Sequence, residues 1–476
     1  MTSSASELAA LDLTDLVAAL RDKRVSAVEL MRHTLERVDA TRERLNAVPV
    51  LAEPEHLLEQ ARAADGRIAA GQARPLEGVP LGVKDLEDAQ GLTTSHGSLA
   101  YRDHVAERDS TQVSRLRNAG AIVVGKTNAP EFGHTAITKN LVYGVTRSPW
   151  DAERTPGGSS GGSAAALVGG VLPLVTASDG GGSIRIPASF VGAFGLKTSY
   201  GRISEGPLHR WSHVKTAVHG PLTKTVRDAA LMLDQVVGHD AYDPVSLPHP
   251  GTSYVAALQE APSKRLRIAF SPDLGHVPVQ SDIAAAVEMA ARTFEKLGHD
   301  LVDLRGGPPD LTAAWGLLNA LEVGGLIEEF LPARAADFTQ SLLSVVRMAE
   351  AMTGSFWHDV SRKRAELVRW CAELFEQYDL LITPTVPFDP PPARGPFPTE
   401  IEGRALPTAS VAAFCIPFNL SWHPAATVRA GISRAGLPIG LQIVAPLQRE
   451  DLLLQVARVY EQERPWHPHW PVETAP

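Results

Sequence analysis

Two glycine-rich clusters constrain this 476-residue chain more than any other feature. The first runs from Thr155 to Ser163 (TPGGSSGGS) and contains Ser159, and the second runs from Ser178 to Pro187 (SDGGGSIRIP) and contains Ser183. Glycine permits positive φ, so such clusters can expose a hydroxyl and direct several amides toward one point. A serine nucleophile needs a base, and its oxyanion needs amide donors. The clusters therefore predict a hydrolase site.

A flexible Gly/Ser linker would have a similar composition. The segment between the clusters, residues 164–176, is however almost entirely apolar, which predicts a buried helix followed by a buried strand. The clusters are therefore expected to be turns within a folded core.

Two bases are candidates for activating the serine. Residues 157–161 (GGSSG) match the G-x-S-x-G nucleophile elbow, which would imply a Ser-His-Asp triad. The preceding residues, 143–156, are polar and contain two prolines, which disfavours the strand that an elbow requires but leaves this alternative open. The other candidate is Lys84, which ends an apolar run in residues 78–85. Burial would favour its neutral amine, a competent general base, whereas a solvent-exposed lysine at a strand end is the alternative.

Several motifs resemble the amidase signature family, whose members hydrolyse amide C–N bonds with a Ser-Ser-Lys triad. They span nearly the whole chain and comprise residues 78–85, 125–128, 157–166, 179–187, 195–201, 378–385, 418–425 and 436–442. The resemblance implies that Ser183 attacks the carbonyl, that Ser159 relays its proton and that neutral Lys84 is the final base. It also implies a cis peptide between Gly158 and Ser159. The implied oxyanion hole consists of the backbone amides of Gly180, Gly181, Gly182 and Ser183.

One position departs from the pattern of the family. Many members carry Thr or Ile after the aspartate of the second cluster, where this chain has Gly180. We expect a less rigid loop or more room for the acyl group at this point. Asp179 and Arg185, which flank the loop, are expected to form a buried structural ion pair, with direct substrate contact as the alternative.

A second motif suggests a nucleotide cofactor but occurs in the wrong structural context. Residues 120–127 (GAIVVGKT) fit the P-loop pattern. Their variable positions are strand-like, and residues 110–119 before them are typical of an amphipathic helix, so the order is helix then strand. We therefore expect no ATP site, and no cofactor is predicted.

Composition excludes several classes of partner. A net charge of −9 provides no basic surface for nucleic acid or an anionic membrane. Cys371 and Cys415 are the only cysteines, and neither a signal peptide nor a long apolar span is present, so a cytoplasmic enzyme is expected. The histidines lack metal-binding spacing, so no metal is predicted. The expected partner is a small-molecule amide, and a homodimer is left open.

The chain alternates between helical and strand-like segments. Helices are predicted at residues 13–22, 27–39 and 311–321, the second with a capping box at Ser26, and strands at 121–124, 171–175, 267–270 and 380–383. Residues 266–304 read as a strand-helix-strand unit. This alternation predicts an α/β fold with a mixed central sheet covered by helices on both faces.

The resemblance implies a single domain over residues 1–476. We divide it into an N-terminal helical region (1–60), a catalytic core (61–240) and a C-terminal part that completes the sheet and pocket (241–476). The connection at residues 242–262 could instead link two separate domains.

The substrate pocket is the least determined feature. Pockets are lined mainly by apolar and aromatic groups with a few polar ones. The candidates are Phe132, His134, Trp211, Trp315, Leu318 and Phe414, although side chains of these types are more often plain core. Their apolar character favours neutral, bulky or aryl amides, with ester or carbamate cleavage as side activities because the oxyanion hole contacts only the carbonyl.

Two alternative functions are also considered. The amidase subunit of a tRNA-dependent amidotransferase commonly has Ser-Ile-Arg-Gln-Pro after the nucleophile, whereas residues 183–187 read Ser-Ile-Arg-Ile-Pro here, which favours a free-standing amidase. A non-catalytic scaffold is disfavoured because the triad residues are all present.

Overall fold

The computed structural model of the chain describes residues 5–208, 212, 214–260, 262, 264–407, 409–466 and 470–471. Trp211 lies outside these residues. Two β-sheets form the centre, a four-stranded sheet of order β1-β3-β2-β6 and a seven-stranded sheet of order β10-β8-β16-β17-β13-β11-β12. Both contain parallel and antiparallel pairs, so the prediction of a mixed α/β sheet architecture is confirmed.

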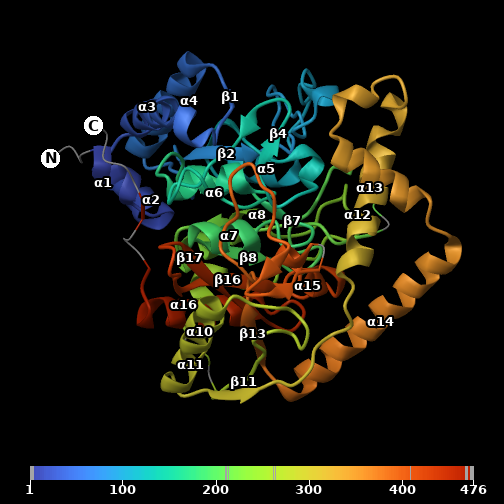
Figure 1. Cartoon of the computed structure of the whole chain (residues 1–476). Coiled ribbons are helices and arrows are strands. Elements are labelled where there is room, and N and C mark those ends of the chain that lie inside the picture. Colours follow the sequence, from blue (N-terminus) through green and yellow to red (C-terminus); the bar gives the residue numbers. More distant parts are fainter. Residues whose placement is uncertain are drawn as a thin grey trace.

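Helices at the N-terminus cover the four-stranded sheet (Figure 1). Ser26 and Glu29 form the predicted capping box, and the helix that it opens continues beyond the predicted end at residue 39. The N-terminal elements are α1 (Ala5–Ala10), α2 (Leu13–Arg21), α3 (Ala27–Leu45), β1 (Val50–Leu51) and α4 (Pro54–Ala69).

The four-stranded sheet holds the strand that ends at Lys84. This strand, β2 (Pro80–Lys84), is buried along its whole length and pairs in parallel with β3 (Ile122–Thr127) and β6 (Leu174–Val175), as continuous apolar runs do in covered parallel sheets. The strand β3 follows α5 (Thr111–Asn118), so the P-loop-like segment is itself a strand, as expected. The helix α6 (Gly161–Val168) precedes β6, which begins later than predicted.

The seven-stranded sheet combines strands from distant parts of the chain. The strand-helix-strand unit is confirmed, with β11 parallel to β12, although its helix is divided into α10 and α11. The helix α7 packs against β8, β16 and β17 from above in Figure 1, and α10 packs against β13, β16 and β17 from below, so helices cover both faces. The bounds are α7 (Arg185–Val191), β8 (Phe194–Lys197), β10 (Leu222–Thr223), α8 (Val226–Val236), α9 (Tyr254–Ala257), β11 (Arg267–Phe270), α10 (Ser281–Ala291), α11 (Thr293–Lys296), β12 (Asp300–Asp303), β13 (Leu380–Pro384), β16 (Ala425–Ile432), β17 (Pro438–Val444) and α16 (Glu450–Glu463).

Three helices extend along one side of the molecule, drawn in yellow and orange at the right of Figure 1. They are α12 (Thr312–Ile327), α13 (Gln340–Glu350) and α14 (Gly354–Gln377). The first is longer than the predicted helix over residues 311–321. An apolar cluster of its own joins α12 to α13 and includes Val323, Ile327 and Val346, with the ring of Phe132 packed against it.

Short elements complete the chain around the sheets. They are η1 (Leu99–Tyr101), η2 (Glu131–Gly133), β4 (Lys139–Asn140), β5 (Gly144–Val145), β7 (Ser178–Asp179), β9 (Val218–His219), η3 (Glu328–Phe330), η4 (Ala335–Asp337), β14 (Glu400–Ile401), β15 (Arg404–Ala405), η5 (Ser410–Ala412) and α15 (Ile416–Leu420). Within the described part of the chain, every helix is too short or too polar to cross a bilayer.

Candidate active site

Lys84 is a buried lysine at the end of β2, with 1% of its surface exposed. The alternative of a solvent-exposed lysine is therefore wrong. Its Nζ lies 2.9 Å from Ser159 Oγ, 2.9 Å from Ser178 Oγ and 3.2 Å from the carbonyl oxygen of Ser178. Burial lowers the pKa of Lys84 to about 7, although the carboxylates of Asp179 and Glu87 favour its charged form. A substantial fraction of the amine is thus neutral near pH 7 and can accept a proton from Ser159.

Ser159 lies in the first glycine cluster, just before α6. The peptide bond between Gly158 and Ser159 is cis, as the family resemblance implied. A Cβ built on Gly133 would lie 3.2 Å from Ser159 Oγ and 2.8 Å from Leu86, and Gly133 has a φ of 70°. Close approach to Ser159 and the positive φ both require glycine at position 133. Within the described part of the chain, the Ser159 hydroxyl is hydrogen-bonded to a lysine, which does not fit the Ser-His-Asp alternative.

Ser183 lies in the second glycine cluster, two residues before the start of α7, and is half-buried. The amide of Ser160 donates to the carbonyl of Ser183 at 3.3 Å, so the two clusters meet as the sequence predicted. The amide of Gly182 donates to Asp179 Oδ1 at 2.6 Å. That amide is already engaged, which removes Gly182 from the expected set of oxyanion donors. Among the described hydrogen bonds, the amides of Gly181 and Ser183 have no protein acceptor.

Asp179 and Arg185 form the expected ion pair beneath this loop, and both side chains are fully buried. Arg185 Nε and Nη2 donate to the two carboxylate oxygens at 3.0 Å each, a bidentate geometry. Asn419 from α15 donates to Asp179 Oδ1 at 2.9 Å, and Gln442 from β17 accepts from Arg185 at 2.7 Å. Desolvation opposes ionisation of Asp179, but Arg185 and Asn419 hold its pKa far below the usual range. The network therefore fixes the loop, as expected of a structural ion pair, and both side chains are engaged with protein groups.

Two of the predicted pocket residues lie on α12. Trp315 Nε1 donates to the carbonyl of Gly180 at 2.8 Å, which places the indole directly on the second glycine cluster. Leu318 packs with Trp315 in one apolar cluster, which also contains Ile186. A side chain of α12 therefore holds the loop at Gly180, and this contact counteracts the flexibility that we expected there.

The other predicted pocket residues are distributed differently. Phe132 adjoins Gly133, and its ring packs toward α12 and α13. His134 follows on the same turn; its buried Nδ1 has no hydrogen-bond partner among the described residues, and burial lowers its pKa. Phe414 is 0% exposed within the main core, so the alternative interpretation as a packing residue fits it better.

Sequence reasoning missed Ser178. Its hydroxyl and carbonyl both contact Lys84 Nζ, and it lies on β7, which pairs with β9. The available signal was its place directly before Asp179 in the second glycine cluster. Asn419 was noted only as part of a motif, and nothing local in the sequence indicated that it would reach Asp179.

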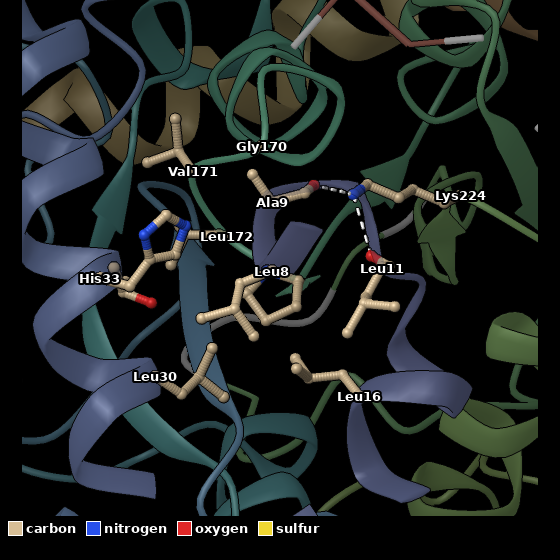
Figure 2. Close-up of a pocket in the computed structure, with 12 residues that line it drawn as sticks. Leu8, Ala9, Leu11, Leu16, Leu30, His33, Gly170, Val171, Leu172 and Lys224 are labelled. Atoms are coloured by element: carbon tan, nitrogen blue, oxygen red, sulfur yellow. Dashed lines mark hydrogen bonds between the residues drawn. The ribbon is translucent and has the colours of Figure 1, made fainter. Parts of the chain in front are cut away.

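A second buried lysine, Lys224, differs from Lys84 in its contacts. Lys224 lies beside a cavity of about 20 Å³ between α1, α2 and α3, which has room for about one water molecule (Figure 2). Its Nζ donates to the carbonyls of Ala9 and Leu11 at 2.7 and 3.0 Å. Its contacts are with main-chain acceptors that cannot give up a proton, whereas Lys84 contacts serine hydroxyls.

In the described part of the chain, no group of three or more His, Cys, Asp or Glu side chains is placed to bind a metal.

Comparison with known proteins agrees with the geometry. The profile of the Amidase family matches residues 29–454. The acylamidase of Rhodococcus erythropolis is 34% identical over 481 residues, covering 98% of both chains. A glutamyl-tRNA(Gln) amidotransferase subunit of Synechococcus sp. (strain RCC307) is 36% identical, covering 93% of this chain and 95% of that protein. The crystal structure of a bacterial aryl acylamidase of the amidase signature family superimposes with a TM-score of 0.91 at 27% identity, over 98% of this chain and 99% of that one. The chain therefore belongs to the amidase signature family and is a hydrolase that acts on amides.

Proposed function

We propose that this protein is a free-standing amidohydrolase that cleaves neutral amides with bulky or aryl groups through an acyl-enzyme on Ser183. The observation that carries the proposal is the contact of 2.9 Å between Ser159 Oγ and a buried Lys84 whose pKa is about 7. A lysine in this state can take the proton of one serine near neutral pH. That serine can in turn relay the proton of the nucleophile.

In the proposed mechanism, Ser183 Oγ attacks the substrate carbonyl while its proton passes to Ser159 Oγ. The proton of Ser159 passes at the same time to Lys84 Nζ, which becomes an ammonium. Collapse of the tetrahedral intermediate breaks the C–N bond, and the leaving nitrogen takes a proton from Ser159, which regains one from Lys84. Water then attacks the acyl ester along the same relay and releases the carboxylic acid. The oxyanion is held by backbone amides, for which Gly180, Gly181 and Ser183 are the candidates.

The substrate class is argued from the apolar groups beside this loop. Trp315, Leu318 and Ile186 belong to one cluster, and Trp315 and Leu318 are only partly buried, so some of their surface can contact a ligand. Phe132 and His134 lie on the turn next to Gly133, close to Ser159. The similar proteins include an acylamidase and an aryl acylamidase. Esters and carbamates present the same carbonyl to the oxyanion hole and are expected as weaker activities.

A specific observation favours a second candidate, the amidase subunit of a tRNA-dependent amidotransferase, since one such protein is 36% identical. Against this, Ile186 occupies the position where those subunits commonly have glutamine, and it is buried in the apolar cluster of Trp315. We therefore place the free-standing amidase first.

The test is a substrate panel with the isolated full chain: an aryl anilide, an aliphatic amide, a p-nitrophenyl ester, an aryl carbamate and glutamine. Wild type should cleave the anilide, whereas Ser183→Ala, Ser159→Ala and Lys84→Ala should lose at least about a hundredfold in kcat. Ser160→Ala is the matched control, since the Ser160 hydroxyl lies in the same cluster and contacts the carbonyl of Ser178 at 3.3 Å. It should retain far more activity than Ser159→Ala. Turnover of glutamine alone would instead support the amidotransferase function.

A further inference from the structure

Trp315 reaches from α12 onto the second glycine cluster and makes two different contacts with it. Its Nε1 donates to the carbonyl oxygen of Gly180 at 2.8 Å. A Cβ built on Gly181 would lie 2.2 Å from Cζ2 of the indole, so the ring packs directly over the Cα of Gly181. One contact sets the direction of a carbonyl, and the other limits how the next residue can move.

These contacts fix the plane of the peptide between Gly180 and Gly181. This peptide is trans, since the cis bonds of the described residues lie elsewhere. In a planar trans peptide the carbonyl and the following N–H point to opposite sides. Donation by Trp315 to the Gly180 carbonyl therefore turns the Gly181 N–H away from the indole. That amide has no acceptor among the hydrogen bonds of the described residues, as an oxyanion donor requires.

Residues 180–182 have no side chain of their own that could fix this peptide plane. Residues 180–182 are three consecutive glycines, the most flexible backbone available. A Cβ on Gly180 would meet only Ala217, at 3.8 and 3.9 Å, so the position has space for a side chain that this sequence lacks. Asp179 holds the far end of the run through the Gly182 amide. The near end is held by Trp315.

The helix that presents Trp315 is itself well anchored. Glu322, two turns further along α12, accepts from the amide of Val214 at 3.3 Å. The carbonyl of Leu326 accepts from the Tyr101 hydroxyl at 3.2 Å, and the α12–α13 cluster packs on Phe132. A group on a rigid element positions a site more accurately than one on a loop.

We propose that Trp315 is a positioning residue, which orients the Gly181 amide toward the oxyanion by holding the Gly180 carbonyl. The inference rests on the proposed acyl-enzyme function. It differs from a substrate-contact role for Trp315 because it concerns stabilisation of the tetrahedral state and not binding of the ground state. Interactions of the first kind change kcat, whereas uniform binding changes KM.

The test is Trp315→Phe, which keeps a ring over Gly181 and removes the N–H donor. With the anilide substrate, kcat should fall about tenfold while KM stays within about twofold, the effect of one hydrogen bond acting in the transition state. An aryl boronic acid forms a tetrahedral adduct with the serine nucleophile, so its Ki should rise by the same factor. Leu318→Ala is the matched control from the same helix and cluster, and it should mainly raise KM.

Two results would overturn the inference: a kcat equal to that of wild type, whether or not KM changes, or a lower kcat with an unchanged boronate Ki. Circular dichroism verifies that Trp315→Phe is folded, and labelling of Ser183 by a fluorophosphonate reports separately on the proposed function. If wild type is labelled and the kcat and boronate Ki of Trp315→Phe equal those of wild type, only the positioning role is refuted. Absence of labelling in folded wild type refutes the proposed function, and the positioning role with it.

Discussion

Replacing Lys84 by methionine should abolish activity and change how the stability of the protein depends on pH. Methionine keeps an unbranched apolar chain in the buried site but cannot be protonated. Lys84 is almost fully buried, and its pKa falls from an ordinary value of 10.5 to about 7. Between these two values the unfolded chain binds a proton that the folded chain rejects, so wild-type stability rises with pH in this window. Methionine removes that contribution.

The magnitude follows from these two pKa values. The lowered pKa of Lys84 reduces the free energy of unfolding by about 4 kcal/mol at pH 7 and by about 1 kcal/mol near pH 9.5. The hydrogen bonds of Lys84 to Ser159 and Ser178, which the variant loses, offset part of its gain at both pH values. The stability of Lys84→Met relative to wild type should therefore decrease by about 3 kcal/mol between pH 7 and pH 9.5.

The assay is equilibrium unfolding in urea, followed by tryptophan fluorescence at both pH values for wild type and variant. Groups that titrate in both proteins cancel in the difference. Lys296→Met on α11 is the control, because this lysine is exposed and its loss should leave the wild-type pH dependence unchanged. A stability difference between Lys84→Met and wild type that does not vary with pH would show that Lys84 is charged in the folded protein, and the proposed base would be refuted.

Three further predictions concern the same site. The value of kcat/KM should rise with pH through an apparent pKa near 7 and level off above it, since the neutral amine of Lys84 is the active form, and a pH–rate profile between about pH 5.5 and 9 checks this. Gly181→Ala should lose at least about a hundredfold in kcat/KM because its Cβ would lie 2.2 Å from the ring of Trp315. Gly180→Ala should stay within about threefold of wild type, because a Cβ there meets only Ala217. Steady-state kinetics of both variants check this, and equal losses would contradict the loop geometry. Arg185→Met should destabilise the protein by about 3–5 kcal/mol, because it leaves a buried carboxylate unpaired, and a urea midpoint equal to that of wild type would refute the structural role of the ion pair.

Local sequence was sufficient wherever a residue's role depends on its immediate neighbours. The capping box at Ser26 was predicted correctly, and the apolar run that ends at Lys84 is a strand, because caps and strands follow from residue types a few positions apart. Whether Lys84 itself is buried was left open by the sequence. The ends of helices were predicted less accurately. The helix α12 runs to Ile327, six residues beyond its predicted end, because packing against α13 stabilises residues whose own pattern does not demand a helix.

Apolar residue type did not predict which side chains face the site. Trp315 and Phe414 are both large and aromatic, yet Trp315 contacts the second glycine cluster and Phe414 is buried in the main core. Hydrophobicity predicts that a side chain leaves water, but not which surface it packs against. That direction depends on how α12 and the segment before α15 pack in three dimensions.

The sequence by itself determined the candidate groups: two serines in glycine-rich turns, a lysine at the end of an apolar run, and an α/β framework to hold them. These features are local, since glycine geometry and strand burial follow from adjacent residues. Only the tertiary structure decided how the second glycine cluster is held, because the groups that hold it come from distant parts of the chain. Trp315 donates to the carbonyl of Gly180, and Asn419 donates to Asp179, whose carboxylate engages the amide of Gly182.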